Sequence, residues 1–327
     1  MARPSNPTAG ASRLRLSLCL IACAALAVAG LAAASRGDGG RVTRARYAMG
    51  TLLEIEAIAP EAAAAEAGVA AAFRAVEEVE RRLSNWREDS ELSLANRSAG
   101  GGPTPLSPAT YRSLFRALAF ARETAGTFDP TVGKSRIGWD SARLDPGART
   151  LFFVRQGGSI DSGAFGKGEG LDHAVAALAR CGVTAARLNF GGQISLAGTA
   201  TREARKRNLG EVAVAEPRRG SARELGRFAP GDGSVSTSSQ SERPGHIRDP
   251  RTGRPAPSGG SVTVVADTGF AADALSTALF VMGPGAGLDF ARRRGIAVLY
   301  VVPSGKEWRL VASPRFPRIT SRLGGPA

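Results

Sequence analysis

Residues 246–283 read HIRDPRTGRPAPSGGSVTVVADTGFAADALSTALFVMG and contain the clearest structural pattern of the 327-residue chain. Within them, Asp249–Gly253 predicts a tight turn, because Asp and Pro open such turns and Gly takes the positive φ that closes them. Residues 261–266 are rich in β-branched side chains, which predicts a strand. The apolar spacing that follows predicts a buried helix ending near Gly283 and Pro284.

This predicted helix carries Asp273 and Thr277, four residues apart. Side chains at that spacing share one helix face, so their oxygen atoms can converge on one point. Two hard oxygen ligands suit Mg²⁺. A helix cap and a hydroxyl bonded back to the preceding turn explain the same pair without a metal. His246 also has two interpretations when it is taken alone: an ordinary polar side chain or a functional residue.

Five further blocks precede this stretch, and together the six blocks span roughly residues 46–302. The five are YAMGT at 47–51, LSNWREDSEL at 83–92, GTFDPTVG at 126–133, DSGAFGKGEGLD at 161–172 and LNFGG at 188–192. In this order, the blocks resemble those of the FAD:protein FMN transferases, the ApbE family. The order of six blocks is more specific than any one of them.

The expected elements mix helices and strands without strict β-α-β alternation, which indicates an α+β fold. The resemblance implies a single catalytic domain of the T-fold-like, ApbE type, with two intimately packed lobes and an FAD cleft between them. We expect this domain over residues 46–312, after a linker over 35–45 and before a disordered tail over 313–327. Residues 217–241 are rich in Arg, Gly and Ser, so we expect a functional flap or a mobile loop there.

A glycine-rich segment at 157–170 leads into a helical pattern. Main-chain N–H groups at such a junction favour an anion, and Lys167 adds a charge, although the GxxxxGK[ST] spacing of a Walker A loop is absent. The resemblance implies that His246 is the general base. It implies that Mg²⁺ is held by the main-chain carbonyl of Ala164 and by Asp273 and Thr277. It also implies that FAD is contacted by Met49, Trp86, Asp129, Asp161, Lys167 and Ile247.

For Trp86, packing in the core is the alternative to a place in the flavin pocket. The resemblance implies Mg²⁺-dependent transfer of FMN from FAD to a Thr or Ser hydroxyl of a partner protein, with release of AMP. The partner would be a subunit of a membrane redox complex with a short Ser/Thr flavinylation motif. An FAD pyrophosphatase and a non-catalytic flavin-binding protein are the alternatives. The second of these is suggested by a segment over 133–160 that is shorter than usual in the family.

The N-terminus predicts export. Arg13 and Arg15 precede an almost uncharged run that ends near Ala34, which is typical of a signal peptide over residues 1–34. An uncleaved membrane anchor is the alternative, because the run is close to spanning length. We therefore expect a periplasmic protein or one attached to the outer face of the inner membrane.

The composition argues against a nucleic-acid-binding protein, a zinc site and an intrachain disulfide. The formal net charge is +14, but aromatic residues make up only 6% and are not interleaved with the Arg runs, so a nucleic-acid-binding platform is not supported. With two His and no CxxC pair, a zinc site is not expected. Cys181 is the one cysteine after the leader, which leaves no partner for an intrachain disulfide.

Overall fold

The computed structural model of the chain describes residues 40–131, 138–257 and 259–320, and the predicted leader lies outside them. These described residues all belong to one compact unit. Antiparallel sheets and packed helices make it a single α+β domain, as the sequence predicts.

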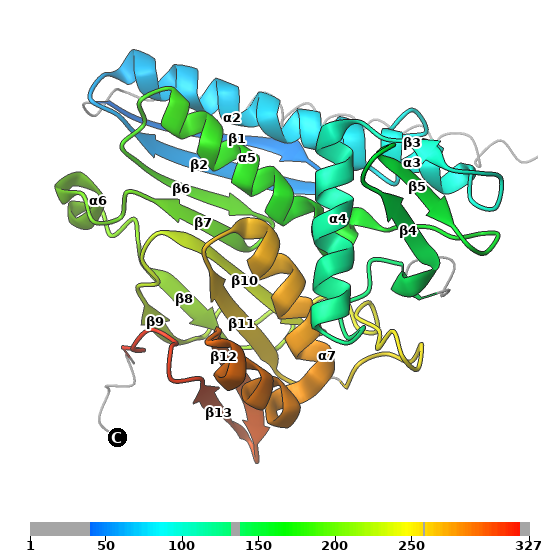
Figure 1. Cartoon of the computed structure of the whole chain (residues 1–327). Helices are drawn as coiled ribbons and strands as arrows, with labels where there is room; N and C mark the ends of the chain where they lie inside the picture. The colour runs from blue at the N-terminus through cyan, green and yellow to red at the C-terminus, as the bar shows by residue number, and fades with distance from the viewer. Residues whose placement is uncertain (1–39, 132–137, 258, 321–327) are drawn as a thin grey trace, which may run out of the picture. The chain divides into compact units, whose positions relative to one another are not determined.

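The core of the domain is an eight-stranded sheet in which each neighbouring pair of strands is antiparallel (Figure 1). The strand order is β1-β2-β6-β7-β10-β11-β12-β13. The strands are β1 Arg41–Ala48, β2 Thr51–Ile58, β6 Ala185–Phe190, β7 Gln193–Ala197, β10 Gly233–Ser239, β11 Ser261–Ala266, β12 Ala297–Ser304 and β13 Glu307–Ala312. In β2, Leu53, Ile55 and Ala57 are buried in alternation with more exposed residues, because successive side chains of a strand point to opposite faces.

The helices α2 Ala62–Leu83, α5 Gly166–Arg180 and α7 Gly269–Arg294 cover one face of this sheet (Figure 1). Helices α2 and α5 share a hydrophobic cluster with β1, β2 and β6, and α7 packs on β11 and β12. Helix α7 is interrupted at Gly283, whose φ of 75° is not helical, at the predicted end of the helix. Its length and composition would suit a membrane span, but 56% of the apolar window is buried, as in a core helix.

Two smaller sheets and shorter helices complete the domain. They are α3 Glu91–Arg97, β3 Thr104–Pro105, α4 Pro108–Glu123, η1 Trp139–Ser141, β4 Ala142–Asp145, β5 Thr150–Phe153, η2 Ser162–Ala164, α6 Arg202–Lys206, β8 Val212–Ala215 and β9 Glu224–Phe228. The helices α3 and α4 pack with β5 against the start of α7. Helix α4 begins after Ser107, whose hydroxyl accepts the N–H of Thr110, a normal N-cap.

The predicted linker over residues 35–45 is too long, because β1 begins at Arg41 and pairs with β2 from Arg41 opposite Ile58 onward. Three of the eight residues of this strand are arginines, and Arg41 Nε lies 2.8 Å from Glu56. Met49 and Gly50 have φ values of 44° and 78°, which makes them a two-residue hairpin turn.

Two expected irregular segments are ordered. The loop expected over 217–241 contains β9 and β10, and β10 lies between β7 and β11. The disordered tail expected over 313–327 is wrong for residues 313–320. Phe316 packs on Phe228 with ring centroids 4.8 Å apart, and Thr320 exchanges two main-chain hydrogen bonds with Arg227.

Candidate active site

A cavity of about 1160 Å³ opens among the β1–β2 turn, the end of α2, the starts of α5 and α7, strand β10 and the loop after it. This volume lies at the upper end for small-molecule pockets and suits a ligand as large as a dinucleotide. All ten residues that the resemblance assigns to the site line this cavity: Met49, Trp86, Asp129, Asp161, Ala164, Lys167, His246, Ile247, Asp273 and Thr277.

The helical wall of the cavity is formed by residues 162–168 and 269–277, at the starts of α5 and α7. Asp273 is only 6% exposed, and its Oδ2 accepts the N–H of Gly168 at 3.2 Å. Lys167 Nζ lies 3.5 Å from the same oxygen. Burial raises the pKa of Asp273, and the charge of Lys167 offsets part of that effect. A buried carboxylate therefore lies beside the positive charge of Lys167.

Helices α5 and α7 approach closely because two glycines face each other. A Cβ on Gly168 would lie 2.2 Å from the carbonyl oxygen of Gly269, and a Cβ on Gly269 would lie 2.5 Å from that of Gly168. Any side chain at either position would push the helices apart. The glycine-rich segment thus has a packing role that its sequence did not reveal.

Hydroxyl groups continue this wall along α7. Thr277 Oγ1 lies 3.3 Å from the carbonyl oxygen of Asp273, which is the back-bonded geometry that its spacing allows. Ser276 is buried and hydrogen-bonded to Ser236 at 3.1 Å and to Ser238 at 2.9 Å. These contacts tie α7 to β10 directly beside the cavity.

The loop wall of the cavity lies within residues 240–256 and carries His246, which is exposed. The Nδ1 atom of His246 is hydrogen-bonded to the carbonyl oxygen of Arg243. Because a carbonyl only accepts, Nδ1 carries the proton of the neutral ring. The Nε2 atom is then the nitrogen that can accept a proton.

Main-chain bonds and one buried amide hold the loop wall. Gln240 is 3% exposed and donates to the carbonyl oxygens of Ile247 at 2.8 Å and Ala256 at 3.2 Å. The predicted turn is present, since the N–H of Gly253 donates to the carbonyl oxygen of Asp249 at 2.7 Å and Gly253 has a φ of 67°. The Ile247 side chain is buried, so His246 is attached to an anchored neighbour.

Trp86 is 96% exposed at the cavity, which excludes the alternative of core packing. Met49 reaches the cavity from the hairpin turn. Its N–H donates to Glu80 of α2 at 3.2 Å, and this bond fixes the turn against the helix.

Asp129 and Asp161 both line the cavity, but each carboxylate also holds its own loop. Asp129 accepts the N–H groups of Thr131 at 2.7 Å and Trp139 at 3.1 Å. Asp161 caps η2 by accepting the N–H of Gly163 at 2.9 Å. Both residues therefore shape the cavity whether or not they also contact a ligand.

Sequence reasoning missed Asn85 and Gln193, which also line the cavity. Asn85 accepts the N–H of Ser162 at 2.8 Å and donates to the carbonyl oxygen of Ile160 at 2.7 Å. Gln193 donates to the carbonyl oxygen of Gly269 at 2.8 Å, and in the described part of the chain its buried Oε1 has no hydrogen-bond partner. Their only sequence signal is that they lie in or beside the quoted blocks.

The oxygen atoms at the helical wall fit Mg²⁺ in kind. Ala164 offers a carbonyl, Asp273 a carboxylate and Thr277 a hydroxyl, and η2 contacts α7. Across residues 40–131, 138–257 and 259–320, no cluster of three or more His, Cys, Asp or Glu could hold a metal by itself. A cation here would need phosphate or water oxygens to complete its shell, which is how Mg²⁺ is usually bound in phosphate sites.

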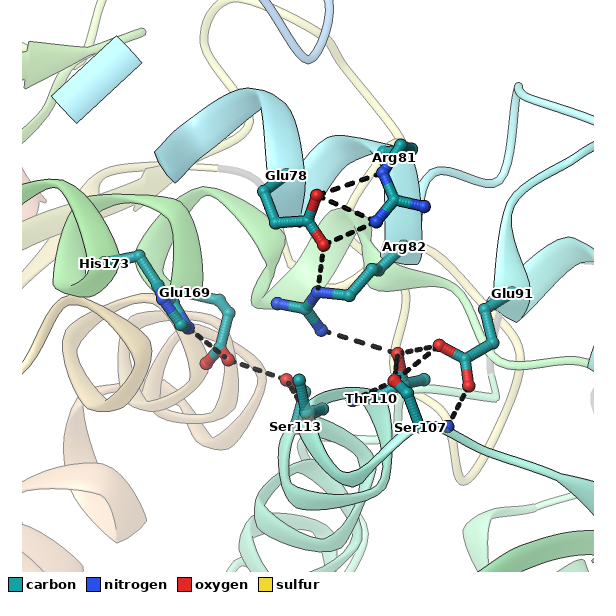
Figure 2. A network of polar contacts seen from close by, with 10 residues as sticks. Glu78, Arg81, Arg82, Glu91, Ser107, Thr110, Ser113, Glu169 and His173 are labelled. Atoms are coloured by element: carbon teal, nitrogen blue, oxygen red, sulfur yellow. Dashed lines mark hydrogen bonds and ion pairs between the residues drawn. The ribbon is translucent and has the colours of Figure 1, made fainter. Parts of the chain in front are cut away.

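Figure 2 shows a network of polar contacts with side chains from α2, α3, α4 and α5. Glu169 is 4% exposed and accepts the hydroxyl of Ser113 at 2.6 Å, and its other oxygen lies 3.0 Å from Arg116. Burial acts to raise the pKa of Glu169, but hydrogen bonds from His173 and Ser113 and the charge of Arg116 outweigh it, so the pKa lies below its ordinary value. Burial lowers the pKa of the neighbouring Arg82.

Comparison with known proteins agrees with this geometry. The model of the ApbE family matches residues 49–300. The chain belongs to the ApbE family. An FAD:protein FMN transferase of Klebsiella pneumoniae is 28% identical over 82% of this chain and 86% of its own length. One from Treponema pallidum is 29% identical over 81% and 87%. The solved structure of the flavin transferase ApbE from Vibrio cholerae has a TM-score of 0.74 and 26% identity, and covers 84% of this chain and 98% of its own.

Proposed function

We propose that this ApbE-family protein transfers FMN from FAD to a Ser or Thr hydroxyl of a partner protein and releases AMP. The carrying observation is that ten residues from distant parts of the sequence line one cavity. The two curated relatives described above are both named FAD:protein FMN transferase, which supports the same reaction.

In this proposal, His246 Nε2 accepts the proton of the acceptor hydroxyl while that oxygen attacks the FMN-side phosphorus of FAD. The bond between this phosphorus and the oxygen of the AMP moiety breaks, and AMP leaves. The protonated Nδ1 and its bond to Arg243 keep Nε2 free for this role. Lys167 lies beside the cavity at the start of α5, where its charge can pair with the pyrophosphate.

We propose Mg²⁺ as the cofactor, held by Asp273, Thr277 and the carbonyl of Ala164. When bound there, it would neutralise pyrophosphate charge and polarise the phosphorus under attack. The burial of Asp273 supports this assignment, because a buried carboxylate is more stable with a second positive charge nearby.

We propose that the acceptor is a subunit of a membrane redox complex with a Ser/Thr flavinylation motif, and that transfer takes place outside the cytoplasm. The support for the location is the charge and apolar pattern of residues 1–34. A fusion of these residues to a reporter that is active only after export should be active. An inactive fusion would contradict the proposed location.

The transfer is tested by incubating the protein with FAD, Mg²⁺ and an acceptor domain and measuring AMP, FMN and FAD by chromatography. We expect AMP to rise together with acceptor-bound flavin. The second candidate is an FAD pyrophosphatase, which the exposure of His246 favours because water can reach it. AMP with an equal amount of free FMN would indicate this hydrolase, and unchanged FAD would indicate a binding protein.

A further inference from the structure

The first N–H groups of helix α7 are capped by a carboxylate of another helix. Asp172 of α5 accepts the N–H of Gly269 with one oxygen and that of Phe270, at 3.1 Å, with the other. The first N–H groups of a helix have no partner within the helix, so an external acceptor fixes where the helix starts. The N-cap Thr268 adds a third bond by accepting the N–H of Ala271 at 3.2 Å.

Arg116 of α4 holds Asp172 in this position. Its Nη2 lies 3.5 Å from Asp172 Oδ2, and its Nη1 lies 3.0 Å from Glu169 Oε2. Its guanidinium also lies 4.1 Å from the ring centroid of Phe270. One side chain thus contacts both carboxylates of α5 and the first turn of α7.

The start of α7 determines where the helical wall places its oxygen atoms. Gly269 lies against Gly168, and Asp273 follows one helical turn later with Oδ2 on the N–H of Gly168. A shift of the first turn of α7 would move Asp273 and Thr277 together relative to Lys167.

We propose that Asp172, oriented by Arg116, is a positioning residue that sets Asp273 and Thr277 for the cation of the transfer reaction. This inference rests on the proposed function and goes beyond it, because Asp172 is not among the residues that line the cavity.

The test compares Asp172→Ala with Asp232→Ala in the full chain. Asp232 is a matched control, because it also accepts two main-chain N–H groups, from Gly198 at 3.0 Å and Thr199 at 2.8 Å, but lies outside the cavity lining. Mn²⁺ binding in the presence of FAD is followed by electron paramagnetic resonance. The Mg²⁺ dependence of AMP release and FAD binding without divalent metal are measured in parallel.

We expect Asp172→Ala to weaken Mn²⁺ binding by about 10-fold or more, as supporting residues of metal sites do. The Mg²⁺ concentration for half-maximal rate should rise similarly, while metal-free FAD binding changes little. Asp232→Ala should lower thermal stability without changing either metal measurement. Asp172→Asn, which keeps the volume and one acceptor, should lie between Asp172→Ala and the wild type and serves if the alanine variant does not fold.

Wild-type Mn²⁺ affinity in a folded Asp172 variant, or absence of Mn²⁺ binding by the wild type, would overturn the inference. If the wild type binds Mn²⁺ but releases no AMP, the proposed function fails. The ratio of Mn²⁺ affinities between variant and wild type then still decides whether Asp172 positions the cation ligands.

Discussion

The two walls of the cavity are built differently. The helical wall brings Lys167 and Asp273 together from positions 106 residues apart, and Asp273 is 6% exposed. The loop wall carries His246 on an exposed segment. Its hydrogen bonds join residues of the same loop, as from His246 to Arg243 and from Gln240 to Ala256. The charged groups of the helical wall therefore depend on contacts between distant segments, whereas the hydrogen bonds of the loop wall are local and only its buried residues Ile247 and Ala256 join the core.

Because of this difference, substitutions in the two walls should affect stability and catalysis differently. A change in the helical wall should alter the free energy of unfolding and the activity together, because its side chains are buried and interlocked. A change at the exposed histidine should alter activity alone.

The largest effect is expected for His246→Ala. Loss of the general base should lower kcat by about 10²–10⁴-fold, while the free energy of unfolding changes by less than about 0.5 kcal/mol, as for most surface substitutions. Steady-state AMP release and chemical denaturation measure the two quantities. His173→Ala is the matched control, since His173 is the only other histidine and does not line the cavity. A similar loss of rate in both variants would contradict the role of His246.

Gly168→Ala should disturb the helical wall. Its Cβ would lie 2.2 Å from the carbonyl oxygen of Gly269, so we expect a loss of about 1–3 kcal/mol of unfolding free energy together with a lower rate. Gly170→Ala is the control in the same helix, because its Cβ would meet Phe190 at an ordinary 3.6 Å. Thermal and chemical unfolding of both variants measure the effect. Equal stability of the two would show that the close approach of α5 and α7 is not needed.

The loss of stability caused by Glu169→Gln should depend on pH in a defined direction. The pKa of Glu169 in the folded protein lies below its ordinary value of 4.5, so its ionised form stabilises the fold above about pH 4.5 and this contribution is lost as the pH falls. We expect the variant to be less stable by about 1–3 kcal/mol at neutral pH. Chemical denaturation between neutral and acidic pH should show that the difference in unfolding free energy between the wild type and the variant becomes smaller below about pH 4.5. A difference that grows towards acid would contradict the account.

Arg251→Ala should have the smallest effect. Arg251 is paired with Asp249 at 2.8 Å but is half exposed, and exposed pairs contribute about 0–1 kcal/mol. We expect unfolding free energy and rate close to those of the wild type. Gln240→Ala is the contrast in the same wall, because it removes the buried amide that donates to the carbonyl oxygens of Ile247 and Ala256 and should cost about 1–3 kcal/mol. A larger effect for Arg251→Ala than for Gln240→Ala would show that ion pairing, and not main-chain bonding, holds the loop.

What the sequence predicted follows the same division. The turn at Asp249–Gly253 and strand β11 rest on local chemistry and are confirmed. The ten site residues were found through ordered blocks, and the structure brings all of them to one cavity.

The predictions that failed concern segments whose structure depends on contacts with residues far away in the sequence. The hydroxyl-rich β10 resembles a loop, but Ser236 and Ser238 bond to Ser276 and lie in the sheet interior. Strand β1 is charged because its arginines meet glutamates of β2 and α2, as in the pair of Arg46 and Glu77. The capping role of Asp172 was likewise invisible, although the residue closes a quoted block. All of these contact partners lie too far along the chain for a local sequence pattern to reveal them.

The most direct test of the account is the intact mass of an acceptor domain after incubation with FAD and Mg²⁺. We predict a gain equal to one FMN phosphoester with the wild type and with His173→Ala, and no gain in the same time with His246→Ala. An unchanged acceptor mass with the wild type, or an undiminished gain with His246→Ala, would contradict the assignment of this cavity.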